Sequence, residues 1–199
     1  MNAPPGKPPI SQRVIDAARD LFYAQGYEVT IDAIAQRASV AKPTVYVHFG
    51  SKDALIQAVL ESASAEFFSR LQLEVTRRSG DPAAQLLAPI DLLVAGLPDP
   101  AYHGCLCLNA AATFPDPGHP AHQVLRDLDQ RLLDTWAGLA AQAGARQPDA
   151  LARQLLLLFD GVKARGLTDD SGVAAGDARA AARALLDRSR RARSPQASE

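Results

Sequence analysis

The sequence predicts an all-α fold of about nine helices. Alanine and leucine dominate the composition while runs of β-branched residues are scarce, which favours helices over strands. Apolar residues recur at the 3.6-residue period of an amphipathic helix, and segments rich in Pro, Gly and Asp separate one periodic stretch from the next. With 47% hydrophobic residues in a chain of 199, there is enough apolar material for a sizeable buried core.

The first quarter of the chain predicts three short helices. The first begins at about Ser11 and ends at Gly26. Thr30 is a suitable N-cap for the second, at residues 31–38, because its hydroxyl can accept a hydrogen bond from a first-turn N–H. Pro43 lies in the first turn of the third, where a missing N–H costs no helical hydrogen bond.

Six further helices are predicted after residue 50. Ser51 is a suitable N-cap for the first of them, and prolines or glycines separate the others. The predicted ranges are 52–78, 83–97, 102–113, 120–143, 149–164 and 177–190. Residues 1–10 predict a disordered arm because four of the first nine residues are prolines, and the polar residues 191–199 predict a disordered tail.

Composition excludes several classes of protein. The longest purely apolar run, Leu155–Phe159, has five residues, far below the roughly 20 that span a bilayer. The N-terminus has no apolar stretch typical of a signal peptide, and two cysteines make no disulfide framework. We therefore expect a cytoplasmic protein with no membrane partner.

Residues 30–49 carry the most specific functional signal. Ala35 lies where two helices can cross closely, Ser39 lies in the following turn, and Val45 anchors the next helix. This spacing is typical of a helix-turn-helix, whose second helix enters the major groove of DNA.

The charge balance gives only weak support for DNA binding. The net charge is −1, and residues 1–56 hold six Lys or Arg against five Asp or Glu. The placement of charge therefore matters more than its sum: Lys42 and Lys52 flank the second helix of the motif, where phosphates would lie.

A specific residue pattern extends beyond the motif through residues 11–60. Its matching positions are Ala17, Leu21, Phe22, Gly26, Tyr27, Thr30, Ile34, Ala35, Ala38, Val40, Thr44, Val45, Tyr46, His48, Phe49, Lys52 and Leu55. The continuation Thr-x-Tyr-x-His-Phe-x-x-Lys is its most distinctive part. This pattern resembles the TetR-type one-component transcriptional regulators, and the segment from Gly104 to Pro120 resembles the ligand-binding domain of one branch of that family.

The chain departs from the family pattern at three places. The connection between Gly26 and Ile34 is one residue shorter than usual, which puts one phosphate contact in question. Ser39 stands where a turn glycine is usual, and Ala41 where a Ser or Thr cap is usual. A serine in the left-handed conformation costs about 1 kcal/mol relative to glycine.

The resemblance implies a DNA-binding domain at residues 11–56 and a helical ligand-binding and dimerisation domain at 57–190. It implies a sequence-specific transcriptional regulator, most simply a homodimeric repressor that a small apolar effector releases from a palindromic operator in double-stranded DNA. No enzyme activity, catalytic residue, cofactor or metal is expected.

The predicted DNA contacts lie around the third helix. The N-terminal end of this helix would face the bases, and the resemblance assigns phosphate contacts to Tyr46, His48 and Lys52. Val45 and Phe49 are expected in the core. The complete set is Thr30, Ala41, Lys42, Pro43, Thr44, Tyr46, His48 and Lys52.

An apolar effector cavity is expected among the helices that follow. Each candidate could equally be an ordinary core residue, and Asn109 is distinctive because a polar side chain in an apolar helix needs a partner. The candidates are Phe67, Phe68, Leu71, Leu93, Leu108, Asn109, Phe114, Leu133, Trp136 and Phe159.

The last two helices, near residues 149–164 and 177–190, are expected to form the dimer interface. The first of them carries two apolar stripes, so it would pack on two sides, and the second offers a small-residue face. The stripes are Leu151, Leu155, Leu158 and Val162, then Leu156 and Phe159; the small-residue face is Ala178, Ala181, Ala182, Leu185 and Leu186. A single intramolecular core using both stripes is the alternative.

Two other function classes are weaker. A metal- or thiol-responsive regulator could use the cluster of His103, Cys105, Cys107, His119 and His122, but Cys-x-Cys on a helix would place its sulfurs about 200° apart. An enzyme is a remote alternative, because the chain has no Gly-x-Ser-x-Gly, His-Glu-x-x-His or Gly-rich phosphate loop.

Overall fold

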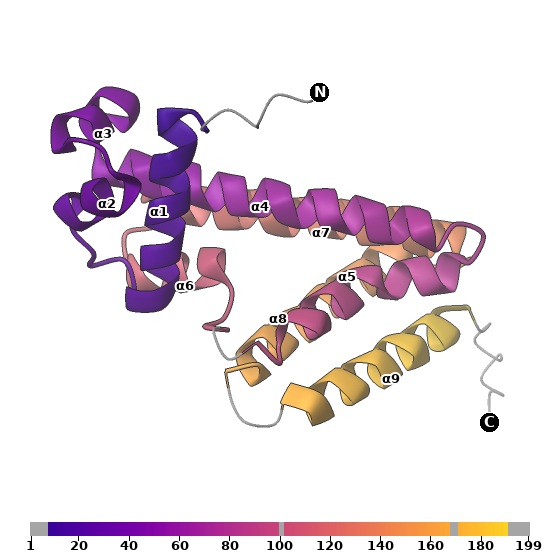
Figure 1. The fold of residues 1–199 in the computed structure, drawn as a ribbon. Helices are drawn as coiled ribbons and strands as arrows, with labels where there is room; N and C mark the ends of the chain where they lie inside the picture. Colours follow the sequence, from indigo (N-terminus) through magenta and orange to yellow (C-terminus); the bar gives the residue numbers. More distant parts are fainter. Residues whose placement is uncertain (1–7, 100–101, 168–170, 191–199) are drawn as a thin grey trace, which may run out of the picture. The chain divides into compact units, whose positions relative to one another are not determined.

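A computed structural model describes residues 8–99, 102–167 and 171–190, which form nine helices and no strand (Figure 1). The helices are α1 (Ile10–Gln25), α2 (Ile31–Ala38), α3 (Lys42–Phe49), α4 (Lys52–Arg77), α5 (Pro82–Gly96), α6 (Leu106–Thr113), α7 (Pro120–Gln142), α8 (Pro148–Arg165) and α9 (Ser171–Arg190). The predicted all-α class is confirmed. A search of the described helices for a segment with the length and hydropathy of a membrane span finds none.

Two helix boundaries differ from the prediction. α6 begins at Leu106 and not at 102, because Gly104 has φ +90° and Cys105 is extended at the N-cap. α9 begins at Ser171, six residues before the predicted start at 177, since the helix continues through Gly176. The predicted arm is shorter than expected because α1 already begins at Ile10; its residues 1–7 and the predicted tail at 191–199 lie outside the described residues.

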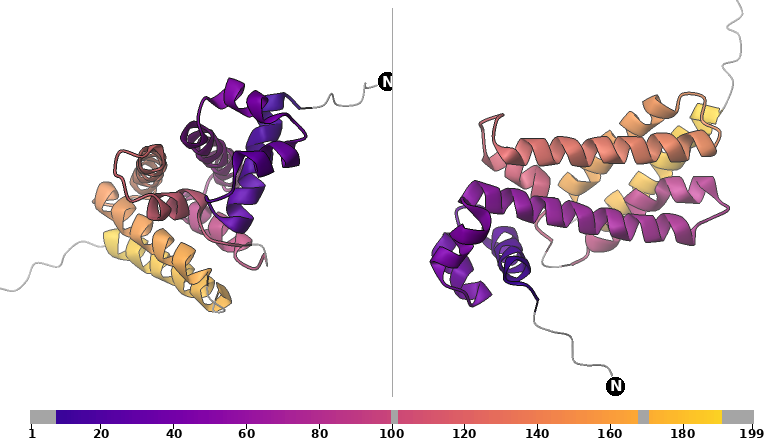
Figure 2. Two further views of the ribbon diagram at one scale, coloured as in Figure 1. Left: turned by 90° about the vertical axis from the view of Figure 1, so that its left-hand side faces the viewer. Right: turned by 90° about the horizontal axis from the view of Figure 1, so that it is seen from above.

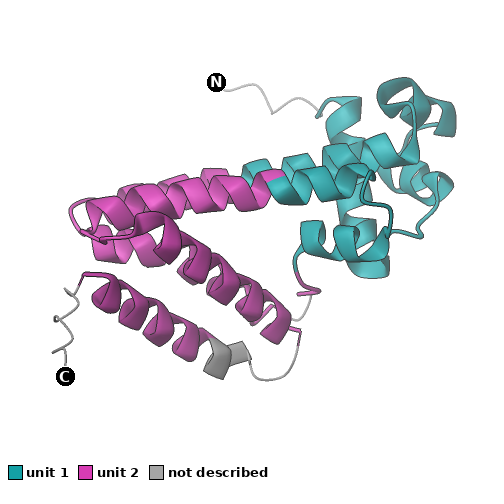
Figure 3. Cartoon of the chain, turned by 180° about the vertical axis from the view of Figure 1, so that it is seen from behind, with its two compact units in different colours: residues 1–66, 105–126 teal, residues 67–104, 127–199 magenta. Residues whose placement is uncertain are grey.

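The chain divides into two compact units (Figure 3). Unit 1 combines residues 1–66 with 105–126, and unit 2 combines 67–104 with 127–199. The N-terminal helices therefore share a unit with α6 and the first turns of α7. Both α4 and α7 have residues in each unit.

Unit 1 has a small core beneath its three N-terminal helices. Val14 and Ala18 of α1, Ile34 of α2, Val45 of α3 and Leu55 of α4 are all buried. Alanines on the inner face of α2 allow it to lie close to α1. This core fixes the directions in which the outer side chains of α3 point.

Unit 2 is centred on α8, which lies beside α9 and also packs on α5 (Figures 1 and 2). Trp136 of α7 and Phe159 of α8 are buried, with ring centroids 5.5 Å apart in an edge-to-face pair. The indole N–H of Trp136 donates to the Leu86 carbonyl at 3.1 Å, so this buried polar group is satisfied. Ala178 and Ala182 are buried on α9 and let it pack closely.

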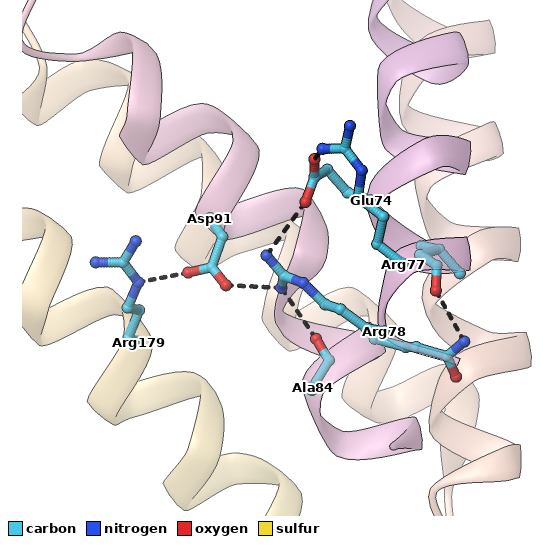
Figure 4. Close-up of polar contacts among 8 residues, drawn as sticks. Glu74, Arg77, Arg78, Ala84, Asp91 and Arg179 are labelled. Carbon is cyan, nitrogen blue, oxygen red and sulfur yellow. Dashed lines mark hydrogen bonds and ion pairs between the residues drawn. The ribbon is translucent and has the colours of Figure 1, made fainter. Parts of the chain in front are cut away.

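One carboxylate of α5 links this helix to α9 and to the turn after α4 (Figure 4). Asp91 of α5 accepts hydrogen bonds from Arg78, in the turn directly after α4, at 2.7 Å, and from Arg179 of α9. Arg78 also donates to the Ala84 carbonyl at 3.1 Å. Since the Asp91 side chain is mostly buried, these charge-assisted bonds hold α9 and the turn after α4 against α5.

We expect Asp91→Asn to lower the free energy of unfolding by about 1–3 kcal/mol, because Arg179 would lose its charged partner and Arg78 would keep only the longer ion pair with Glu74, at 3.7 Å. Urea unfolding followed by circular dichroism measures this. The control Asp134→Asn alters an exposed i,i+4 contact with Gln130, and it should change stability by less than about 0.5 kcal/mol. Equal effects of the two substitutions would contradict a linking role for Asp91.

Candidate nucleic-acid interface

The turn between α2 and α3 has the geometry of a helix-turn-helix. The Thr30 hydroxyl caps α2 by accepting from the Ala33 N–H at 3.2 Å. Ser39 ends α2 in the left-handed conformation, with φ +54° and ψ +50°, and the Val40 N–H closes the turn on the Ala35 carbonyl at 3.0 Å. Ser39 therefore adopts a conformation that glycine would reach at lower cost.

An arginine from α1 binds this turn. The Arg13 guanidinium donates to the carbonyl oxygens of Ala38 and Ser39, the second at 3.0 Å. The last carbonyls of a helix have no intrahelical partner, so this cation is well placed to satisfy them. Sequence reasoning missed Arg13, because no local pattern marks a contact across 26 residues.

The outward face of α3 contains an exposed apolar side chain that the sequence reasoning also missed. Val45 is buried, as predicted, and Phe49 is half-buried. At 100° per residue, Val47 lies almost opposite this inner face, and 82% of it is exposed. The sequence could have indicated Val47, because it is an apolar residue of this helix that does not lie on the buried stripe.

The eight predicted DNA contacts all fall in unit 1, at the start of α2, on α3 and at the start of α4. Those on the exposed surface are Thr30, Ala41, Lys42, Pro43, Tyr46 and His48, while Thr44 and Lys52 are half-buried. No side chain caps α3 at Ala41, in keeping with its departure from the family pattern.

Lys42 is already engaged by a carboxylate. Its Nζ lies 2.7 Å from Asp32 Oδ2 of α2, and both side chains are exposed. The hydrogen bond that Lys42 donates to the Asp32 carboxylate, together with the negative charge of Asp32, raises the pKa of Lys42, so the ammonium stays protonated. A DNA phosphate or base would have to compete with Asp32 for this cation.

The ten predicted effector contacts separate into two groups. Leu108, Asn109 and Phe114 belong to unit 1, where Leu108 is exposed and the other two are half-buried. The seven in unit 2 comprise buried Leu71, Trp136 and Phe159 and half-buried Phe67, Phe68, Leu93 and Leu133.

Four of the unit 2 residues form an aromatic cluster. Phe67 lies 5.4 Å from Phe68 and 6.1 Å from Phe159 between ring centroids, and Phe159 contacts Trp136. Two surface hollows in unit 2 lie elsewhere. One of about 440 Å³ is between α5 and α9, and one of about 580 Å³ is between the start of α8 and the end of α9; none of the ten residues lines either.

Charged groups adjoin this aromatic cluster. Lys163 is only 4% exposed; its Nζ lies 3.0 Å from Asp160 Oδ1 and 4.6 Å from the centroid of the Phe159 ring. Asp129 of α7 has a buried Oδ1 with no hydrogen-bond partner. Burial raises the pKa of Asp129, Lys163 opposes that shift, and Asp160 adds to it.

The predicted metal- or thiol-responsive cluster is not assembled as one site. Cys105 precedes α6, so the helical angle between the two sulfurs does not apply, and the Cys107 thiol lies 3.9 Å from the Leu60 carbonyl. His122 Nε2 lies 2.7 Å from the Phe114 carbonyl. Over the residues that the structure describes, no group of three or more His, Cys, Asp or Glu could hold a metal ion.

We expect Asp129→Asn to raise the melting temperature at pH 7. A carboxyl whose pKa is raised on folding disfavours the folded state above that raised pKa, and the penalty disappears below the unfolded-state value. The gain should therefore shrink as the pH falls toward about 4. Thermal unfolding across this range measures it; a gain that does not change with pH would contradict the burial argument.

We expect Asp32→Asn to strengthen DNA binding about two- to fivefold, because Lys42 would no longer be held by a carboxylate. Lys42→Gln should weaken binding and reduce the slope of log K against log salt by about one. Fluorescence anisotropy with a labelled duplex measures both. In the Lys42→Gln background Asp32→Asn should have little effect; an unchanged gain there would show that Asp32 acts only by general repulsion.

Known proteins with a helix-turn-helix are similar to this chain in sequence and in fold. Residues 14–59 match the family model described as bacterial regulatory proteins, tetR family. A TetR-family transcriptional regulator of Streptomyces coelicolor, SCO4454, is 32% identical over 92% of this chain and 96% of its own, with a TM-score of 0.84. A putative regulator of Streptomyces avermitilis is 29% identical over 92% and 98% of the two chains, with a TM-score of 0.78.

Curated relatives point the same way. The regulator YjdC of Escherichia coli is 26% identical over 79% of this chain and 83% of its own length. The transcriptional repressor ComR of Escherichia coli is 34% identical over 59% and 58% of the two chains. These proteins are named as transcriptional regulators, and none of them as an enzyme.

Proposed function

The chain belongs to the TetR family of helix-turn-helix transcriptional regulators, and we propose that it is a dimeric repressor that a small-molecule effector releases from a palindromic operator. The observation that carries this proposal is the exposed face of α3, held outward by buried Val45 and by the Ser39 turn. The repressor assignment is supported by the name of the ComR relative.

α3 would enter the major groove with its N-terminal residues and outer face toward the bases. Lys42 and Thr44 offer hydrogen bonds to base edges, and the exposed Val47 offers an apolar contact to a thymine methyl group. Tyr46, His48 and Lys52 would hold phosphates, which position the protein without reading sequence.

A dimer would supply the specificity that one short helix lacks. α3 has eight residues, so only a few side chains of one copy can reach bases. A twofold dimer that reads two half-sites doubles the sequence read and requires a palindromic operator.

The structure corrects the expected apolar stripes of the last two helices. Leu151, Leu155 and Val162 are buried together with Phe159, which was assigned to the second stripe, so one stripe already serves the core of unit 2. Leu158 falls outside that stripe and is half-buried. On α9 the buried residues are Ala178, Ala182 and Leu186, while Ala181 and Leu185 are half-buried.

The apolar surface left for a second copy centres on Leu157. This side chain is 73% exposed, and half-buried Leu156 and Leu158 adjoin it. One turn further, an added Cβ on Gly161 would meet nothing within 4 Å. Ala180 and Ala184 are exposed on α9, which packs beside α8, and a helix of a second copy could approach these small side chains closely.

The effector would act by shifting a population of conformations. An apolar molecule inserted at the aromatic cluster of Phe67, Phe68, Trp136 and Phe159 would favour arrangements in which those rings separate. Because α4 and α7 have residues in both units, such a change can reach the DNA-binding helices. The loss of operator affinity equals the difference in effector affinity between the two arrangements.

Selection from a random-sequence duplex library tests the proposed function. The full-length protein should enrich a palindrome whose half-sites lie about one or two helical turns apart. Enrichment of no sequence, or of a single asymmetric site bound by a monomer, would overturn the proposal. Screening small apolar compounds for release of the selected duplex then tests the effector.

We expect Leu157→Glu to produce a monomer, because it places a charge in the proposed interface. Its affinity for the full palindrome should fall about 100-fold or more, since the avidity of two linked half-sites is lost. Analytical ultracentrifugation and anisotropy measure the two effects. The control is Leu73→Glu on α4, another exposed leucine at 58%; a dimer that tolerates Leu157→Glu would contradict this interface.

A further inference from the structure

The connection between α6 and α7 is built around stacked rings of unit 1. The rings of Phe114 and His119 are parallel to within 12°, with centroids 3.9 Å apart. Phe114 also meets the edge of Tyr27 at 5.6 Å. The buried Tyr27 hydroxyl donates to the Leu106 carbonyl at 2.7 Å, and burial raises the pKa of this phenol, so it stays a donor. These contacts fix the position of the His119 ring.

A backbone hydrogen bond fixes the tautomer of that ring in its neutral form. His119 directly precedes α7, and its Nδ1 accepts from the Ala121 N–H at 3.1 Å, as an N-cap side chain would. In the neutral imidazole the proton must then be on Nε2. His119 therefore presents an N–H donor on the side facing away from α7.

This donor faces the first turn of α4. His119 Nε2 is buried and makes no hydrogen bond, and Asp53 Oδ1 lies 3.6 Å away. The side chain of His119 is 10% exposed, whereas that of Asp53 is largely open to solvent. A small movement of Asp53 would bring the pair within hydrogen-bonding distance.

Asp53 occupies a sensitive place for DNA binding. It follows Lys52, a proposed phosphate contact, and lies four residues after the end of α3. Ser51 caps the same turn through the Ala54 N–H at 3.0 Å. The orientation of this turn therefore sets where Lys52 meets the DNA backbone.

We propose that His119 is a positioning residue for operator binding that acts through Asp53. The ring holds the first turn of α4, and with it Lys52, in the position that DNA requires. His119 does not itself touch DNA. The inference rests on the proposed function and adds to it a defined contact by which α7 influences the DNA-binding helices.

A purely structural role for His119 makes a different prediction. Stacking on Phe114 and capping of α7 would both be lost on substitution whether or not Asp53 carries a charge. A role through Asp53 requires that carboxylate. The two roles are therefore distinguished by substituting His119 in two backgrounds.

The experiment measures operator affinity for His119→Asn with Asp53 present and with Asp53→Ala, which removes the acceptor. Asparagine keeps an acceptor for the Ala121 N–H but cannot reach Asp53. We expect about a three- to tenfold loss of affinity with Asp53 present and less than a twofold change in the Asp53→Ala background. An equal loss in both backgrounds, or none in either, would overturn the proposal.

His122→Gln is the matched control. Its imidazole lies in the first turn of α7 and contacts the Phe114 carbonyl, so any effect should be the same in both backgrounds. Thermal unfolding establishes that each variant is folded at the assay temperature. If His119→Asn is not folded there, His119→Gln takes its place in the same comparison. The wild-type protein tests the proposed function separately. If wild type binds no selected duplex, the proposed function is wrong; if wild type binds a duplex but the effect of His119→Asn is the same in both backgrounds, only the positioning role is wrong.

Discussion

The DNA-reading surface depends on how the chain turns between α2 and α3. The turn closes through a left-handed Ser39, the Val40 to Ala35 hydrogen bond and the cation of Arg13 on the last carbonyls of α2. Burial of Val45 beneath that turn then fixes the rotation of α3 about its own axis. Because a two-turn helix has little stability of its own, its outward residues are ordered only through these tertiary contacts.

Local features of the interface could be predicted from the sequence. The Thr30 cap and the first-turn Pro43 depend on neighbours within a few residues, and both are present in the structure. Contacts between distant residues could not be predicted, and these include Arg13 with Ser39 and His119 with Asp53. The periodicity of an amphipathic helix shows that a face is apolar but does not show what covers it.

The stripes of α8 illustrate that limit. A helix that is apolar on two sides must pack on two sides, but its sequence cannot say which stripe faces its own chain. The structure assigns Leu155 and Phe159 to the core and leaves Leu157 outside. Likewise, the apolar character of residues 102–113 could not show that Gly104, with its positive φ, delays the start of α6.

The pairing of Lys42 with Asp32 has a consequence for how the protein searches a genome. If Lys42 contacts DNA as proposed, at a random stretch of DNA it would remain paired with Asp32, and the duplex would gain little from it. Only a site that offers a better partner than Asp32 would draw the ammonium away. Such a pairing would shorten dwell times on non-target DNA relative to those on the target, so that a nearly neutral protein would scan DNA quickly and still stop at its operator.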